Sequence, residues 1–140
     1  MKIKMLNALT IALLTGIPLF ANATTGGDLP GQWVGNSQVE GMRSVARTTL
    51  ILGAPDAEDS TLRIDGETSC TLAHGKYSAN GDAWSLKFSD VRGGSACSRL
   101  AQGTFVLHAG NKPRSLQFEA SYPGADGGQS LRRGALTRYP

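Results

Sequence analysis

From Gly31 to the C-terminus, apolar residues recur at every second position, and no stretch shows the 3.6-residue period of a helix. The clearest run is residues 84–89, where apolar and polar side chains alternate strictly, and residues 115–122 repeat the pattern. Successive side chains of a strand point to opposite faces, so these runs are expected to be half-buried antiparallel strands. The alternation therefore predicts an all-β fold.

Turn signals divide this pattern at short intervals. Asp65-Gly66 and Asn80-Gly81 are typical of two-residue hairpin turns, because glycine adopts a positive φ without steric cost. No segment is predicted to be a helix. The predicted strands are residues 32–38, 43–52, 61–65, 68–79, 83–89, 99–108, 115–122 and 130–138.

Eight consecutive strands joined by short connections most simply form a single antiparallel up-and-down β-barrel, and a two-sheet β-sandwich is the alternative. Closure is favoured because an open meander would expose two strand edges. Eight strands make an interior just wide enough for side chains or one small ligand, and the 117 residues from 24 to 140 leave few for the long strands and loops of a large cavity. We therefore expect a mostly filled barrel whose function lies on its rims and loops.

Residues 1–23 have the pattern of a secretory signal peptide. Lys2 and Lys4 precede an uncharged apolar stretch, and Ala21-Asn22-Ala23 places small residues at a cleavage site. A membrane anchor is the poorer interpretation, because the unbroken apolar stretch is shorter than the roughly 20 residues that a span requires. We therefore expect residues 24–140 to form a single domain without a membrane span, located in the periplasm or secreted.

Export determines how the two cysteines are interpreted. Cys70 and Cys97 would enter an oxidising compartment, where an even number of cysteines indicates a disulfide. Closing this loop would constrain the unfolded chain by about 3 kcal/mol in the chain-entropy model. A catalytic cysteine would instead need a thiolate and a positioned base.

The charge of the chain gives little support for nucleic-acid binding. The net charge is +3, but removal of the leader leaves 12 basic and 11 acidic residues. Residues 24–91 carry a net charge of −4 and residues 92–140 carry +5. Interleaved strands would mix these charges on the surface, so we expect no nucleic-acid partner.

No catalytic or metal-binding motif is present. His74 and His108 lie on separate segments without metal-ligand spacing, and no serine lies in a Gly-x-Ser-x-Gly elbow. Asp56, Glu58 and Asp59 form an acidic loop, which lacks the length and glycine placement of a calcium-binding loop. We therefore predict a protein that is not an enzyme and has no cofactor or metal.

Three arginines lie on the last predicted strand. Arg132 and Arg138 share one face of that strand and Arg133 takes the other, so at least one of them points toward the barrel core or its mouth. A buried arginine needs a carboxylate, carbonyl groups or an aromatic face. Because closure would bring the first and last strands together, Trp33 is a candidate partner for Arg133 or Arg138.

Gly31-Gln32-Trp33, together with an arginine on the last strand, resembles the calycin pattern of lipocalins and their relatives. That resemblance implies a barrel opened by Gly-x-Trp, in which a basic residue of the final strand packs on the tryptophan. The chain is shorter than a typical lipocalin and shows no terminal helix. In size, leader and single disulfide it is also similar to small exported β-barrels that inhibit lysozymes or proteases.

These observations favour a binding protein that docks a protein partner, as an inhibitor or immunity-type module. The alternative is a calycin-type binder of a small hydrophobic ligand, and core packing would account equally for its candidate residues. Those aromatic candidates are Trp84, Phe88, Phe105, Phe118 and Tyr122.

Overall fold

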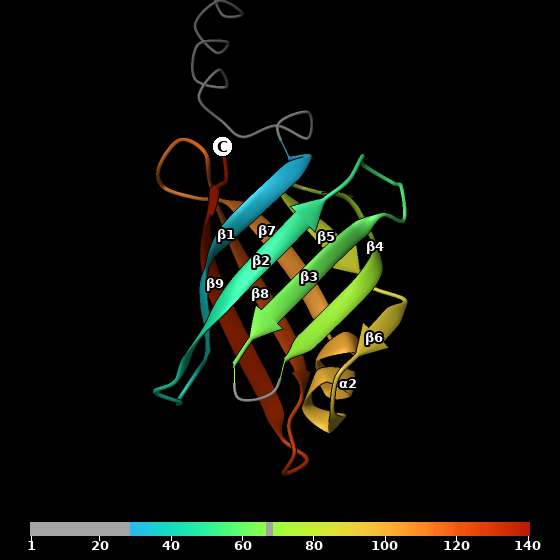
Figure 1. The fold of residues 1–140 in the computed structure, drawn as a ribbon, viewed down its shortest axis with the longest axis vertical. Coiled ribbons are helices and arrows are strands. Elements are labelled where there is room, and N and C mark those ends of the chain that lie inside the picture. The colour runs from blue at the N-terminus through green and yellow to red at the C-terminus, as the bar shows by residue number, and fades with distance from the viewer. Residues whose placement is uncertain (1–28, 67–68) are drawn as a thin grey trace, which may run out of the picture.

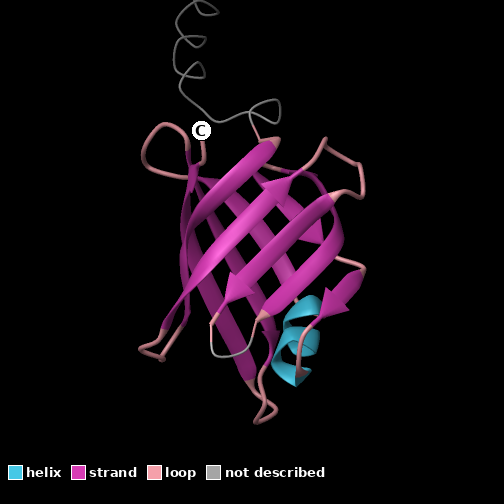
Figure 2. Cartoon of the chain, viewed as in Figure 1, coloured by secondary structure: helices cyan, strands magenta, loops and turns pink. Residues whose placement is uncertain are grey.

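The described strands form one closed antiparallel sheet with a single short helix beside it (Figures 1 and 2). The computed structural model describes residues 29–66 and 69–140, so the predicted leader lies outside the described residues. The elements are β1 (Gly31–Val39), β2 (Val45–Leu52), β3 (Ser60–Asp65), β4 (Cys70–Asn80), β5 (Ala83–Lys87), β6 (Asp90–Arg92), α2 (Ser95–Ala101), β7 (Thr104–Ala109), β8 (Ser115–Pro123) and β9 (Gln129–Arg138).

The strand order confirms the predicted up-and-down barrel. The order is β3-β2-β1-β9-β8-β7-β5-β4-β6, and β3 also pairs with β4 to close the sheet. β1 and β9 pair antiparallel from Trp33 opposite Arg138 to Val39 opposite Arg132. Eight strands therefore make one closed sheet, not the two sheets of the alternative sandwich, and β6 is an extra strand paired with β4.

The prediction that no helix would occur was wrong. Residues 95–101 form α2, so the strand predicted for residues 99–108 begins only at Thr104. Cys97 and Leu100 are three residues apart and both are buried, which is the spacing of one helical face. A helix of seven residues spans only about two turns, too few for its period to be recognised in the sequence.

Two connections also differ from the predicted turns. The segment predicted as a break around Val91 contains the short strand β6. Asp65 belongs to β3 and pairs with Arg47, while Ile64 pairs with Cys70, so the β3–β4 connection is longer than a two-residue turn. None of the helices in the described residues has the length and apolar character that membrane crossing requires.

Large side chains fill the interior of the barrel. Trp33, Tyr77, Phe105 and Phe118 are each 1% exposed, and inward leucines from most strands pack between them. Phe88 and Phe105 meet edge to face with ring centroids 5.3 Å apart. This packing places the aromatic residues considered for a hydrophobic ligand among the core side chains, with Trp84 and Phe88 partly buried against it.

A glycine on β9 makes room for one of these rings. Gly134 pairs with Phe118 of β8, and a Cβ atom at position 134 would overlap the Phe118 ring. The absence of a side chain therefore lets Phe118 lie across β9 inside the barrel.

We expect Gly134→Ala to lower the free energy of unfolding by about 1–3 kcal/mol, because the added methyl group overpacks the core. Gly66→Ala is the matched control, since the nearest neighbour of its Cβ would be Ala46 at 3.8 Å. Urea denaturation of both variants measures the difference. Adding Phe118→Leu to Gly134→Ala should recover part of the loss, and equal costs at positions 134 and 66 would contradict this account.

Candidate functional site

Trp33 closes the end of the barrel at which β1 begins, which is the upper end in Figure 1. Its indole Nε1 donates a hydrogen bond of 2.8 Å to the carbonyl oxygen of Leu29, which is fully buried. The guanidinium carbon of Arg138 lies 5.5 Å from the centroid of the Trp33 ring, within the range of a cation–π contact. One tryptophan thus joins the segment before β1 to the end of β9.

Gly31 has a steric role in this cap. Its φ is +138°, and a Cβ atom there would lie 2.8–2.9 Å from the guanidinium atoms of Arg138. Any larger residue would push Arg138 away from Trp33. In the Gly-x-Trp pattern of this chain, the glycine therefore leaves room for the Arg138 guanidinium that packs on the tryptophan.

Arg133, the other arginine considered for this cap, does not contact Trp33. It lies on the outer face of β9, where its guanidinium forms ion pairs of 3.1 Å with both Glu40 and Glu119. All three side chains are well exposed. The Glu40 pair joins residues 93 apart in sequence, so the acidic first part and the basic last part of the chain do meet on the folded surface.

The predicted disulfide is confirmed and lies at the lower end of the barrel. Cys70 at the start of β4 is bonded to Cys97 of α2, and both are buried. Gly93 precedes the helix with a φ of +151°, and a Cβ there would lie 2.8 Å from the Cβ of Cys97. The bond therefore anchors α2 beside β4, β6 and β8, where the helix covers part of this end (Figure 1).

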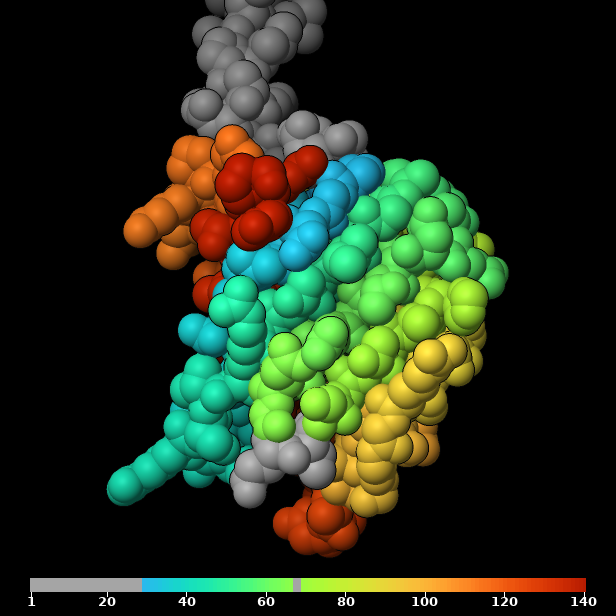
Figure 3. Space-filling view, viewed as in Figure 1, coloured from blue at the N-terminus to red at the C-terminus, as the bar shows by residue number. Residues whose placement is uncertain are grey.

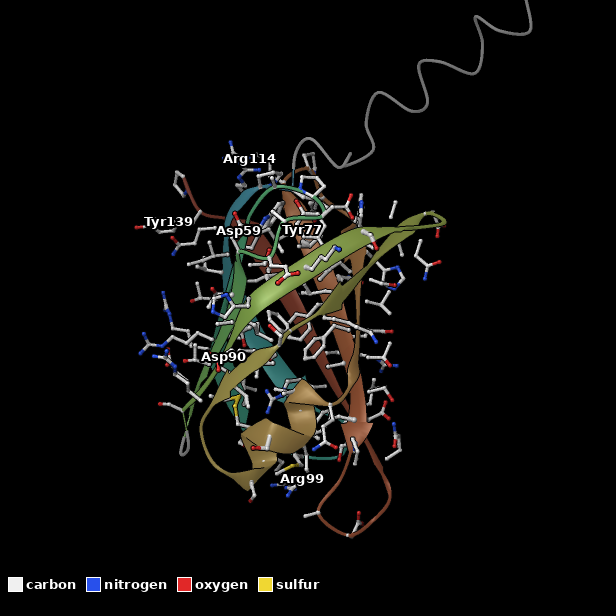
Figure 4. All side chains as sticks on the ribbon, turned by 90° about the vertical axis from the view of Figure 1, so that its right-hand side faces the viewer. Asp59, Tyr77, Asp90, Arg99, Arg114 and Tyr139 are labelled. Carbon is white, nitrogen blue, oxygen red and sulfur yellow. A yellow bond between two sulfur atoms is a disulfide. The ribbon has the colours of Figure 1, made fainter. Side chains whose placement is uncertain are left out.

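The β2–β3 connection folds over the upper end and is held by Tyr77 of β4. The Tyr77 hydroxyl donates a 2.7 Å hydrogen bond to the carbonyl of Gly53, and the Tyr77 carbonyl accepts one from the Asp56 amide. Figure 4 shows Asp59 beside Tyr77 at this end. Burial raises the pKa of the Tyr77 hydroxyl, and the negative charges of Asp59 and Asp56 raise it further.

The acidic loop and the histidines do not assemble a metal site. No group of three His, Cys, Asp or Glu residues with metal-binding geometry occurs among residues 29–66 and 69–140. Asp59 instead folds back against Gly53 within its own connection. His74 is exposed at a bend in β4 with a φ of +53°, and His108 lies apart from it on β7.

The sequence analysis did not recognise a buried series of side-chain hydrogen bonds in the lower half of the barrel. Arg132 donates a 2.8 Å hydrogen bond from Nη1 to Ser37 Oγ, which lies 2.7 Å from Thr48 Oγ1. Ser37 is 2% exposed and Thr48 is fully buried. Strand alternation placed Arg132 and Arg138 on one face, but pairing of Arg132 with Ser37 depends on the register between β9 and β1.

Three shallow hollows lie in a row on the outer face of β1, β9 and β8. The central one, of about 330 Å³, includes Ala135 and Gln117, and it shares both with a hollow of about 300 Å³ at the β7–β8 connection. It shares Gln38 and Arg133 with a third, of about 310 Å³, at the β1–β2 hairpin. Figure 3 shows this edge recessed between two projections, the orange β7–β8 connection and the teal β1–β2 hairpin.

The fold and these sites define a small antiparallel β-barrel with one disulfide, a capped upper end and a hollowed outer face. No protein-family model and no curated protein matches the chain. Its resemblance to calycins remains a prediction based on Trp33, Gly31 and the last-strand arginine.

We expect Arg138→Ala to lower the free energy of unfolding by about 1–2 kcal/mol, because the cation–π contact and the packing of the side-chain stem are both lost. Arg133→Ala is the control on the same strand and should cost less than about 1 kcal/mol, since its ion pairs are exposed. Urea denaturation followed by tryptophan fluorescence measures both. A larger loss for Arg133→Ala would contradict the assigned role of Arg138.

The raised pKa of Tyr77 predicts a loss of stability in alkaline solution. The free energy of unfolding should hold level up to about pH 10, the ordinary tyrosine pKa. It should then fall as the pH rises through the raised pKa of the folded state, because the unfolded chain releases this proton first. Tyr77→Phe should cost about 1 kcal/mol at pH 8 and should lack this alkaline decrease. Urea titrations from pH 8 to 11 test it, and parallel curves for both proteins would contradict it.

Proposed function

We propose that this chain is an exported, non-enzymatic binding protein that docks a protein partner on the outer face formed by β1, β9 and β8. The observation that carries the proposal is the position of the hollows, which form a continuous row outside the barrel while large side chains fill its interior. The same packing is why we favour a protein partner over a small hydrophobic ligand held inside, since ligand pockets are usually concave and apolar spaces.

The chemistry of this face suits a protein interface. Asn36, Ala135 and Gln117 lie opposite one another across β1, β9 and β8, and the row below contains Gln38 and Arg133. Ion pairs to Glu40 and Glu119 compensate the charge of Arg133. Arginine is enriched in protein interfaces, and charged clusters of this kind are typical of their polar rim.

Apolar side chains are exposed at the hairpin end of the same face. Met42 is 55% exposed and Val45 is 57% exposed, and each contributes to one of the hollows. Exposed apolar residues beside the amide side chains of this face provide buried area on binding. The closed sheet behind them is rigid, which lowers the entropic cost of docking.

Export is part of the proposal. The pattern of residues 1–23 and the disulfide between Cys70 and Cys97 together support an oxidising compartment, the periplasm or the exterior. In that setting a rigid module of this size suits an inhibitor or immunity-type role against another exported protein. Panels of lysozymes and proteases are therefore the first targets to assay.

We expect Ala135→Arg to weaken partner binding by at least about tenfold, because a long charged side chain would occupy the central hollow. Ala79→Arg is the matched control, since Ala79 is also exposed on a strand but belongs to β4. The tagged proteins are compared by capture from envelope extract, and the purified partner is then titrated by calorimetry. Circular dichroism checks that both variants fold.

The proposal fails if Ala135→Arg and Ala79→Arg retain the same partner with the same affinity. It also fails if the unmodified protein retains no stoichiometric partner and inhibits no member of the lysozyme and protease panels.

A further inference from the structure

The β7–β8 connection, residues 110–114, projects at the upper end of the outer face (Figure 3). Lys112 lines the hollow of about 300 Å³ beside it, and this hollow shares Ala135 and Gln117 with the one at the centre of the face. Ser115 constrains the connection, because its hydroxyl accepts a 3.1 Å hydrogen bond from the Lys112 amide and donates one to the Lys112 carbonyl. A projecting loop that is fixed in this way loses little conformational entropy on binding.

Arg114 has a left-handed backbone conformation that residues other than glycine seldom adopt. Its φ is +60°, and its carbonyl accepts a 3.0 Å hydrogen bond from the Arg138 amide at the end of β9. Glycine would satisfy this backbone geometry without the steric conflict of a Cβ atom. The Arg114 side chain forms no ion pair with any described residue, so the contacts of the fold give no reason for an arginine here. Strained conformations of this kind cluster at functional sites.

Lys112 and Arg114 give the upper end of the docking face a net positive charge. Both side chains are exposed, and neither forms an ion pair within the described part of the chain. At the hairpin end of the face, Arg43 and Arg133 are matched in number by two glutamates, and Arg133 is paired with both of them. The acidic β2–β3 connection lies on the other side of the upper end from the β7–β8 connection (Figure 1).

An exposed aromatic ring lies at the same end as these two cations. Tyr139 is 55% exposed, and Figure 4 shows it at the upper end with Arg114. Its amide donates a 2.7 Å hydrogen bond to the carbonyl of Gln32, so its backbone continues the pairing of β9 with β1. Tyrosine and arginine are among the residue types most enriched in protein interfaces. This end therefore combines positive charge, exposed aromatic area and a constrained backbone.

We propose that the β7–β8 connection and Tyr139 select a partner with an acidic protein surface, whose carboxylates bind Lys112 and Arg114. The inference rests on the proposed function, because it assigns the chemistry of the partner to the face already proposed for docking. A carboxylate matches the planar guanidinium of Arg114 with both of its oxygens, and the Lys112 ammonium acts as a point charge. Charges at the rim of an interface chiefly accelerate association, so the partner should associate more slowly as the ionic strength rises.

NMR titration with a synthetic peptide tests this chemistry without the partner. The probe alternates glutamate with glycine, and the same peptide with glutamine in place of glutamate is its uncharged control. At low ionic strength we expect saturable shifts of the Lys112, Arg114 and Tyr139 amide resonances with the glutamate peptide only. Lys76 and Lys87 are the internal control, because they are exposed cations opposite each other on β4 and β5, away from this face.

Three results of this titration would overturn the proposal. The first is the absence of a saturable shift in the β7–β8 connection, and the second is an equal shift at Lys76 and Lys87, which would indicate a general attraction of anions to exposed cations. The third is tighter binding of a single-stranded oligonucleotide of equal charge, which would indicate a nucleic acid in place of a protein.

Charge reversal tests the same site with the partner itself. In the capture and calorimetry experiment used for Ala135→Arg, we expect the double variant Lys112→Glu/Arg114→Glu to weaken binding by at least about tenfold at low ionic strength. Lys76→Glu/Lys87→Glu changes the net charge equally and should change binding by less than about twofold, because these residues lie away from the interface. If Ala135→Arg weakens binding while both double variants keep the original affinity, this inference fails and the docking face stands. If no partner is retained at all, the proposed function fails, and the peptide titration still decides whether the connection binds carboxylates.

Arg114→Gly separates binding from a structural role. Glycine relieves the left-handed conformation, which offsets the greater freedom that it gives the unfolded chain, so the Tm should not fall. The response to the glutamate peptide should weaken in the same variant. A lower Tm with unchanged peptide binding would show that the arginine supports the fold, and it would overturn the proposal.

Discussion

Pairing between β1 and β9 is the interaction on which the rest of this structure depends, because it closes the sheet. The two strands align from Trp33 opposite Arg138 to Val39 opposite Arg132, and antiparallel hydrogen bonds there leave neither strand with an open edge. The same register places Arg138 over Trp33 at the upper end and Arg132 beside Ser37 in the lower half. One alignment thus produces the closed sheet, the contact of Arg138 with Trp33 at the upper end and the hydrogen bond of Arg132 with Ser37.

Closure also decides how the interior of the barrel is occupied. Eight strands of this length leave an interior that Trp33, Phe105 and Phe118 can fill, and Gly134 makes room for the last of these rings. The hollows lie on the outer surface instead, where the connections beside β9 project and the sheet between them is recessed. The guanidinium of Arg132 is a charged group within this barrel, where it donates a hydrogen bond to Ser37.

Strands were predicted correctly where one face of the strand is buried and the other is exposed to solvent. Residues 115–122 alternate strictly, and the structure buries Leu116, Phe118, Ala120 and Tyr122 of β8 on one face. The helix α2 was missed because its position depends on the disulfide and on the gap between β4 and β8, and a seven-residue segment has little helical propensity of its own. Local pattern therefore predicted the sheet, and tertiary contacts decided the helix.

By itself, the sequence determined the all-β class, the disulfide between Cys70 and Cys97 and the importance of Trp33, because alternation, turn signals and cysteine count are local properties of the chain. It favoured a closed barrel but left a β-sandwich as the alternative, and the pairing of β1 with β9 in the tertiary structure decided between them. Only the tertiary structure decided which arginine meets Trp33, which meets Ser37 and which lies outside between Glu40 and Glu119. The physical reason is register: a shift of one residue between β1 and β9 would exchange the two faces of the strand, and register is set by the packing of the whole barrel.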